Sequence, residues 1–227
     1  MNISVIIPAL DEAGNIGAAI TSARRCTDAE VVVVDGGSRD GTADVAAGLG
    51  AVVTHSPRGR AVQMNRGAVL ATGDVLLFLH ADTTLPEGYE VHIRRILEKQ
   101  GVVAGAFMLG LDAPGATFRV IERLANFRSR AFGLPYGDQA IFITASAFRA
   151  VGGYIETPIM EDYDLMRRVG RLGKVELAPA RVTTSARRWL RLGVIKTTLI
   201  NQANIVAWHA GVSPERIKKW AGASRRL

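Results

Sequence analysis

The sequence predicts an α/β protein built on a doubly wound, mostly parallel sheet. Four short apolar runs recur near the start of the chain, at Ile3 to Ile7, Val31 to Val34, Ala51 to Thr54 and Val75 to Leu79. Helix-like stretches follow the first three runs, beginning near Asp11, Thr42 and Arg60. Strands without polar alternation are buried on both faces, which is typical of a parallel sheet covered by helices. Repeated strand–helix units therefore predict the α/β class.

The later elements follow in order. Pro86 opens a predicted helix, and strands are expected at Val102 to Leu109 and Ala140 to Thr144, on either side of a basic helix from about Thr117 to Phe132. Gly152-Gly153 predicts a turn, Glu161 to Val169 a helix and Val175 to Leu177 a short strand. The pattern from Trp189 to Trp208 is helical, and Ser213-Pro214-Glu215 opens a last helix by capping.

Charge is distributed unevenly along the chain. Residues 1–180 hold 18 Lys and Arg against 20 Asp and Glu, whereas residues 181–227 hold 10 against Glu215 alone. Such a basic segment predicts contact with an anionic partner, and near anionic lipid each cation gains roughly 1 kcal/mol. The helical stretch includes Arg191, Lys196 and Asn201, which are too polar for a bilayer span. An amphipathic helix, packed on the domain or lying on a membrane surface, fits better.

Composition excludes several classes of protein. Hydrophobic residues make up 48% and charged residues 22%, which rules out a disordered chain. The single cysteine, Cys26, excludes a disulfide framework and a cysteine-rich metal site. Aromatic residues are only 6%, which argues against a nucleic-acid binder that stacks bases. The N-terminus lacks the pattern of a secretory signal, so we expect a cytoplasmic protein.

Polar residues follow three of the apolar runs, at Pro8 to Glu12, at Asp35 to Thr42 and at His80 to Asp82. Open α/β sheets bind ligands at the carboxyl ends of their strands. Asp11 and Asp40 are well placed as helix caps. Asp35 and Asp82 directly follow apolar strands: the first can accept hydrogen bonds from a base or ribose, and the second can hold a divalent cation that bridges to phosphate. The absence of a Gly-x-Gly-x-x-Gly or Walker motif argues against a nicotinamide dehydrogenase and a P-loop NTPase.

These segments resemble the N-terminal signatures of family 2 glycosyltransferases of the GT-A fold. The resemblance rests on Val5 to Glu12, Val34 to Thr42 and Leu79 to Asp82, and extends through Gly137-Asp138-Gln139 and Met160-Glu161-Asp162. Five motifs in the right order carry more weight than any one of them. The resemblance implies an inverting transfer from a nucleotide-diphosphate sugar, with UDP favoured over GDP, assisted by Mg²⁺ or Mn²⁺.

The resemblance also implies a role for each motif residue. Asp162 falls at the place of the catalytic base, with Glu161 beside it, and Asp82 at that of the metal ligand. The implied nucleotide-sugar contacts are Pro8, Ala9, Glu12, Asp35, Gly36, Ser38, Arg60, Asn65, His80 and Ala81. The implied acceptor or diphosphate contacts are Asp138, Gln139, Arg187, Arg188 and Trp189. A single domain of 227 residues is expected, with a nucleotide-sugar-binding half at 1–110, an acceptor and catalytic half at 111–180, and a basic helical extension at 181–227.

Several of these assignments have structural alternatives. His80 stands where the family's aspartate-x-aspartate motif begins, and it can bind ribose or phosphate or simply pack. Glu161-Asp162 can be an acidic first helical turn, and Asp138 can cap a turn. Asn65, like its neighbours Gln63 and Gly67, can face solvent. The segment Arg187-Arg188-Trp189 resembles the end of the Gln-x-x-Arg-Trp motif of processive members without its glutamine, and can be a basic surface around one buried tryptophan.

Three other functions remain to be separated from this one. A sugar-phosphate nucleotidyltransferase would carry a glycine-rich loop with Arg and Lys where this chain has Pro8 to Glu12. A nucleic-acid-binding module would use the basic C-terminal segment, but acidic strand ends would repel phosphate. A degenerate, non-catalytic relative is kept open by His80. The expected partners are therefore a nucleotide-sugar donor, an acceptor that is lipid-linked or phosphate-bearing, and an anionic membrane on its inner face, with no nucleic acid.

Overall fold

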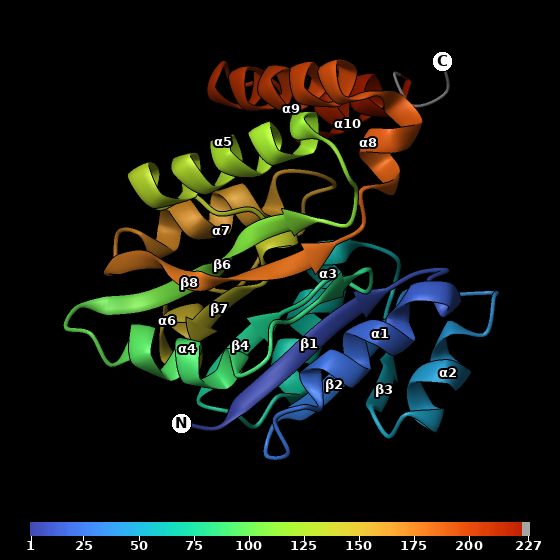
Figure 1. The fold of residues 1–227 in the computed structure, drawn as a ribbon, viewed down its shortest axis with the longest axis vertical. Coiled ribbons are helices and arrows are strands. Elements are labelled where there is room, and N and C mark those ends of the chain that lie inside the picture. The colour runs from blue at the N-terminus through green and yellow to red at the C-terminus, as the bar shows by residue number, and fades with distance from the viewer. Residues whose placement is uncertain (224–227) are drawn as a thin grey trace.

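An eight-stranded sheet with helices on both faces forms the protein, whose computed structural model describes residues 1–223 (Figure 1). The strands are β1 (Ile3–Ala9), β2 (Glu30–Asp35), β3 (Val52–His55), β4 (Val75–Phe78), β5 (Thr83–Thr84), β6 (Val102–Leu111), β7 (Ile141–Thr144) and β8 (Lys174–Thr184). The helices are α1 (Ala13–Ala23), α2 (Thr42–Gly48), α3 (Arg60–Leu70), α4 (Tyr89–Leu97), α5 (Ala116–Phe132), α6 (Ala145–Ala150), α7 (Glu161–Val169), α8 (Arg187–Leu192), α9 (Val194–His209) and α10 (Pro214–Ala223), with a 3₁₀ turn at Gly137–Gln139.

The sheet is mixed, in the order β3-β2-β1-β4-β7-β6-β8-β5. Strands β3, β2, β1 and β4 are parallel, β7 runs antiparallel to β4 and β6, and β8 is parallel to β6. The register pairs Ala9 with Asp35. The predicted α/β class is confirmed, and the carboxyl ends of β1, β2 and β4 meet at one edge of the sheet.

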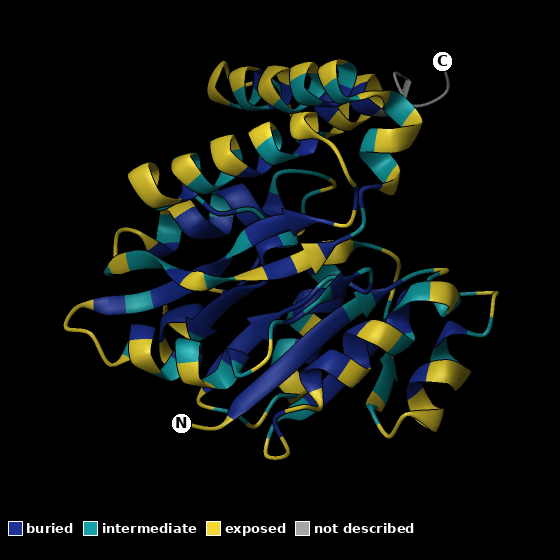
Figure 2. Ribbon diagram, in the orientation of Figure 1, coloured by how far each residue is buried: buried dark blue, intermediate teal, exposed yellow. Residues whose placement is uncertain are grey.

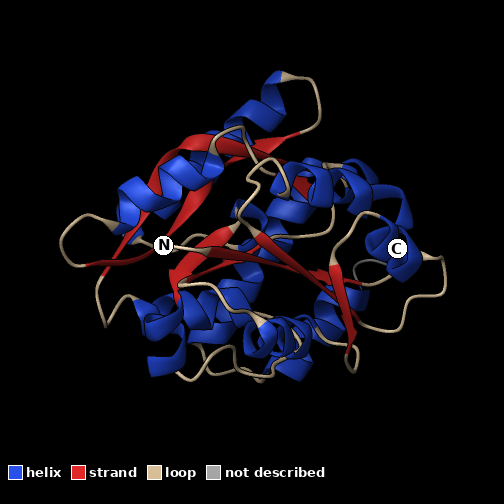
Figure 3. Ribbon diagram, turned by 90° about the horizontal axis from the view of Figure 1, so that it is seen from below, coloured by secondary structure: helices blue, strands red, loops and turns tan. Residues whose placement is uncertain are grey.

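Two apolar layers cover the sheet, one on each face, and the helices of both layers are visible from below (Figure 3). Ile16 and Ile20 of α1 and Ile93 of α4 pack on one face, whereas Met64 of α3 and Leu165 of α7 pack on the other. Strand β1, near the centre of the sheet, is dark blue along almost its whole length in Figure 2. These layers fix the strand ends that form the site.

Several predicted elements differ from the observed ones. The helix expected from Pro86 begins at Tyr89, after Gly88 takes a left-handed conformation. The short strand expected at Val175 to Leu177 is the 11-residue β8, because its pairing with β6 continues past two register shifts. The prediction that Asp11 caps the first helix is wrong: Asp40 accepts the Ala13 N–H at 2.9 Å, and Asp11 accepts that of Arg39.

The C-terminal segment folds as three helices. The single helix predicted from Trp189 to Trp208 is broken at Gly193, where φ is 80°, into α8 and α9. Trp189 and Val194 pack against a buried cluster that includes Phe118 of α5 and Leu109 of β6, which attaches these helices to the domain. The last four residues of the predicted extension, 224–227, lie outside the described residues. Within residues 1–223, every helix is too short or too polar to cross a bilayer.

Candidate active site

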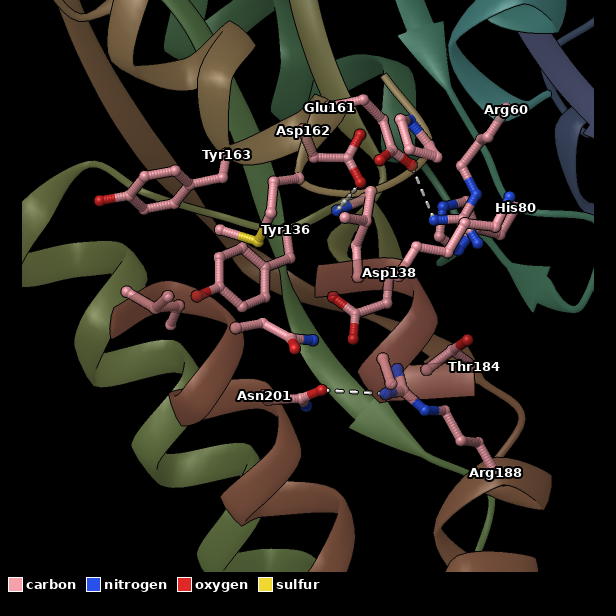
Figure 4. Close-up of a pocket in the computed structure, with 18 of the residues that line it drawn as sticks. Arg60, His80, Tyr136, Asp138, Glu161, Asp162, Tyr163, Thr184, Arg188 and Asn201 are labelled. Atoms are coloured by element: carbon pink, nitrogen blue, oxygen red, sulfur yellow. Dashed lines mark hydrogen bonds and ion pairs between the residues drawn. The ribbon is translucent and has the colours of Figure 1, made fainter. Parts of the chain in front are cut away.

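A pocket of about 1560 Å³ opens between the sheet edge and the C-terminal helices. Its wall on the sheet side includes Arg60 at the start of α3, His80 and Asp82 after β4, and the first turn of α7. Helices α8 to α10 form the opposite wall. Of the predicted site residues, the pocket brings together Arg60, His80, Asp82, Asp138, Glu161, Asp162, Arg187, Arg188 and Trp189. Figure 4 labels six of them: Arg60, His80, Asp138, Glu161, Asp162 and Arg188.

Asp162 is buried at the start of α7. The preceding Met160 has φ of 70°, a conformation rare for residues other than glycine and often found at functional sites. One carboxylate oxygen, Oδ2, accepts the Gly137 N–H at 3.1 Å, while Oδ1 has no hydrogen-bond partner within residues 1–223. Burial, reinforced by the charge of Glu161, raises the pKa of Asp162 to about 7. A carboxylate with such a pKa is suited to accept a proton at neutral pH.

Arg60 and His80 complete the polar floor of the pocket. Arg60 Nη1 lies 3.0 Å from Glu161 Oε1, so the buried Glu161 carboxylate is paired. Burial and then the charge of Arg60 lower the pKa of His80 to about 3, which keeps its imidazole neutral. His80 Nε2 is buried and unpaired in the described chain. It is therefore available to bind a polar group of a ligand.

Asp138 and Arg188 face the same space from the other side (Figure 4). Burial raises the pKa of Asp138, and the charges of Arg128, Arg60 and Arg188 oppose this effect. Arg188 donates a hydrogen bond from Nη2 to Asn201 Oδ1 at 3.0 Å, which links α8 to α9. This side of the pocket thus combines a carboxylate with cations.

Arg187 joins the C-terminal helices to the strand ends. Its guanidinium makes a two-pronged ion pair with Glu12, through Nη1–Oε2 at 2.9 Å and through Nη2–Oε1, and Nη2 also lies 3.0 Å from Asp82 Oδ2. Burial raises the pKa of Asp82, and Arg187 partly opposes this. Two carboxylates from the segments that follow β1 and β4 thus share one cation.

The predicted base-binding residues form a separate cluster beyond this ion pair. Asp35 is buried and accepts the N–H groups of Gly37 and Ser38 at 3.0 Å and the Ser38 hydroxyl. Burial alone would raise the pKa of Asp35, but the hydrogen bonds from Ser38 and Gly37 outweigh it and lower the pKa. The carboxylate therefore holds its own loop, including Gly36, in shape. Pro8 and Ala9 lie at the adjacent end of β1.

The side chains of two predicted contact residues, Asn65 and Gln139, are hydrogen-bonded to other parts of the protein. The Asn65 amide exchanges hydrogen bonds with the backbone of Tyr154, at 2.8 and 2.9 Å. The Gln139 side chain is buried, donates to the Phe107 carbonyl and accepts from the Ser129 hydroxyl. Neither residue lines the pocket, and both side chains have structural partners within the protein. Their predicted contacts with ligands therefore stay predictions.

Gly137 and Tyr154 are site residues that the sequence did not single out by themselves. A Cβ at Gly137 would lie 2.7 Å from His80 Nε2 and closer still to Asp162 Oδ2. Burial and the charge of Asp162 raise the pKa of Tyr154, whose buried hydroxyl lies beside that carboxylate. The Gly137-Asp138-Gln139 motif pointed to the first, whereas no local signal pointed to the second.

A family model described as Glycosyl transferase family 2 matches residues 4–151. The chain belongs to this family. It is 35% identical over 181 residues to the PGL/p-HBAD biosynthesis glycosyltransferase of Mycobacterium bovis, covering 71% of this chain and 66% of that protein. It is 30% identical over 199 residues to the succinoglycan biosynthesis protein ExoA of Rhizobium meliloti, covering 74% and 58%. The chain thus spans just under two thirds of the first relative's length.

Solved structures of glycosyltransferases share the fold. A mannosyltransferase of Pyrobaculum calidifontis, in complex with GDP-Man and Mn²⁺, superposes with a TM-score of 0.63 at 19% identity, over 80% of this chain and 56% of that one. Glucosyl-3-phosphoglycerate synthase of Mycobacterium tuberculosis, with Mn²⁺, UDP and phosphoglyceric acid, gives 0.60 at 20% identity, over 81% and 69%. The predicted GT-A fold is confirmed.

Proposed function

We propose that this protein transfers a sugar from a nucleotide-diphosphate sugar to an acceptor hydroxyl with inversion, and that Asp162 is the base. The observation that carries the proposal is the state of Asp162. Its buried carboxylate lies in the pocket wall, one of its oxygens has no hydrogen-bond partner among the described residues, and its pKa is raised to about 7. Family membership supports the glycosyltransferase class.

The reaction is a single in-line displacement. The acceptor oxygen attacks the anomeric carbon, its proton passes to Asp162 Oδ1, and the bond from that carbon to the diphosphate oxygen breaks on the opposite face. The Gly137 N–H holds the other carboxylate oxygen, which orients the base. Glu161, paired with Arg60, keeps a second negative charge beside Asp162 and favours the protonated base after the transfer.

The nucleoside would bind at the ends of β1 and β2. Asp35 shapes the loop of Gly36 and Ser38, and Pro8, Ala9 and Glu12 form the adjoining strand end. We favour a UDP-sugar over a GDP-sugar as donor. Arg60 and the neutral His80, with Ala81 beside it, would contact the diphosphate or the sugar.

A divalent metal, Mn²⁺ or Mg²⁺, fits the residues present. Within residues 1–223 no cluster of three metal-ligating side chains exists. Magnesium in phosphate sites needs only one or two carboxylates in addition to the phosphate oxygens. Asp82, with Glu12 beside it, would supply them, and their shared ion pair with Arg187 supports a cation at this position. When bound, the metal would stabilise the charge of the leaving diphosphate.

The acceptor would enter between α7 and the C-terminal helices. Asp138, Arg188 and Trp189 line this side, together with Lys218 and Lys219 of α10. Cations here would attract a phosphate-bearing acceptor, which can be lipid-linked. Gln139 supports this wall from behind through its bonds to Phe107 and Ser129.

Thermal unfolding tests the donor site directly. Wild type and Asp82→Ala are melted with UDP or GDP, each with and without Mn²⁺, because ligands that bind only the native state raise the melting temperature. A metal-dependent shift with UDP that Asp82→Ala loses supports the proposal. The absence of a shift with either nucleotide, in a chain that melts cooperatively, contradicts it and favours the degenerate relative.

Catalysis needs a separate measurement. Asp162→Asn keeps the size of the side chain but cannot accept the proton. It should bind the nucleotide as wild type does and release nucleoside diphosphate from the sugar nucleotide at least 100-fold more slowly, within the usual range for losing a general base. Unchanged release would show that another group is the base.

A further inference from the structure

Large apolar side chains are exposed mainly at one end of the molecule. Among the described residues, eight are more than 60% exposed, and all except Val69 lie on α5, α8 or α9. These helices lie together at the top of Figure 1, and Figure 2 shows exposed bands along α5 and α9. Scattered exposed hydrophobics are normal, whereas a concentration on neighbouring helices indicates an interaction surface.

The spacing places these side chains on the outer stripe of each helix. On α5, Val120, Leu124 and Phe127 follow the i, i+4, i+7 pattern of one helical face, while Phe118 and Glu122 lie on the buried face. Helix α5 therefore carries large apolar side chains on its exposed face as well as on its buried face. A surface helix that needed only to cover the domain would be polar outside.

Helix α9 repeats the arrangement. Ile195, Leu199 and Val206 are 64 to 77% exposed and share its outer face, whereas Thr197, Asn204 and Ala207 are buried. We call the six residues Val120, Leu124, Phe127, Ile195, Leu199 and Val206 the outer helical face.

The exposed charges on α5, α8 and α9 have one sign. Arg123 and Arg130 on α5 and Arg191 on α8 are exposed beside it. In these three fully described helices the only acidic residue is Glu122, which is buried and paired with Arg119 at 2.8 Å. An apolar stripe flanked by cations is complementary to an anionic bilayer, whose headgroups attract the arginines while its acyl region accepts the aromatic and aliphatic tips. A second copy would present cations to cations.

We infer that the outer helical face docks the protein on an anionic lipid bilayer. The basic C-terminal segment contributes charge, and α5, in the middle of the chain, contributes half of the apolar contact. The inner sides of α8 and α9 line the pocket with Arg188, Trp189 and Asn201. If the proposed function holds, docking would therefore keep the acceptor side of the pocket near the membrane; only this step of the inference rests on that function.

Vesicle flotation tests the inference. The full chain is floated with phosphatidylcholine vesicles that contain or lack phosphatidylglycerol. The variant Leu124→Ser/Phe127→Ser removes two exposed tips. Its matched control, Val69→Ser/Val91→Ser, removes two exposed tips from α3 and α4, outside the outer helical face. All three tryptophans lie in α8 to α10, so their emission reports contact with lipid independently.

Wild type and the control should float with the anionic vesicles and show a blue-shifted emission, and the Leu124→Ser/Phe127→Ser variant should bind at least tenfold more weakly while melting at an unchanged temperature. Asp162→Asn should float like wild type, which separates docking from catalysis. The inference is overturned by failure of wild type to float, by equal flotation of the test variant, or by a stable dimer that this variant dissociates.

Discussion

Replacing Gly137 by Ala tests whether the site is held by close packing around this glycine. An added Cβ would lie 2.7 Å from His80 Nε2 and 3.0 Å from Asp162 Cγ, whereas ordinary contacts begin at 3.4 Å. The imidazole or the backbone must therefore move by about 0.7 Å, and the nearer carboxylate oxygen further. Misplacing a catalytic group by ~1 Å costs on the order of 100-fold in rate, and overpacking costs about 1–3 kcal/mol in stability.

The assay is release of nucleoside diphosphate from the sugar nucleotide, measured against pH, together with the melting temperature. Gly137→Ala should remain folded, lose about 100-fold in kcat, and show a pH profile displaced to higher pH. The reason is that lengthening the hydrogen bond from the Gly137 N–H to Asp162 Oδ2 raises the pKa of Asp162 further. Gly14→Ala is the control, since a Cβ there meets nothing within 4 Å. If Gly137→Ala kept the wild-type rate and pH profile, the reasoning about Asp162 would be refuted.

Three further predictions concern charged groups. The folded-state pKa of Asp162, about 7, exceeds its ordinary value of 3.8. Therefore kcat/KM should rise with pH and level off above about pH 7, and stability should fall by a few kcal/mol between pH 4 and 7. Asp162→Asn should lack this fall in stability, and a melting temperature that decreased with pH as it does in wild type would contradict the prediction. Asp35 has a lowered pKa, so its stabilisation is present above about pH 4 and is lost as the pH falls through that lowered pKa. Asp35→Asn should cost about 1–3 kcal/mol at pH 7 in urea unfolding, and this cost should shrink as the pH falls below about 4; a cost that stayed constant with pH would exclude a charge effect. Arg187→Gln should change stability by less than ~1 kcal/mol, because the guanidinium is half exposed. It should nevertheless weaken UDP binding, measured by calorimetry, several-fold, whereas the control Arg66→Gln should bind UDP normally. An unaltered affinity in Arg187→Gln would exclude Arg187 from the donor site.

The fold was predictable where one helix or strand determines its own pattern. The apolar runs of β1, β2 and β4 are buried on both faces, so their sequence alone identifies them. Strand β8 was underestimated because it alternates polar and apolar residues and gains its length from pairing with β6. The break at Gly193 and the delayed start of α4 at Gly88 depend on left-handed glycines, whose conformation a helical pattern does not reveal.

The candidate site was predictable at strand ends and helix starts, where topology brings distant residues to one edge. Arg60, Asp82 and Asp162 meet in one pocket as their motifs predict. Asn65 and Gln139 could not be assigned in this way, because their partners are backbone atoms of Tyr154 and Phe107, up to 89 residues away. Which polar group a side chain meets is decided by tertiary packing, not by local spacing.

The acidic groups around the pocket destabilise the fold. Glu161 and Asp162 are adjacent and buried, and Arg60 pairs with only one of them. Burying a carboxylate without a full set of partners costs several kcal/mol, and apolar side chains would pack the start of α7 at no such cost. Asp162 with its raised pKa, His80 with its unpaired nitrogen, and Gly137, whose added Cβ would clash with both side chains, lie within contact distance of one another. Strain that is concentrated at one point of an otherwise consistent fold is best explained by what binds there, and here the residues with unpaired atoms, His80 and Asp162, line the pocket in which a sugar and its acceptor would meet.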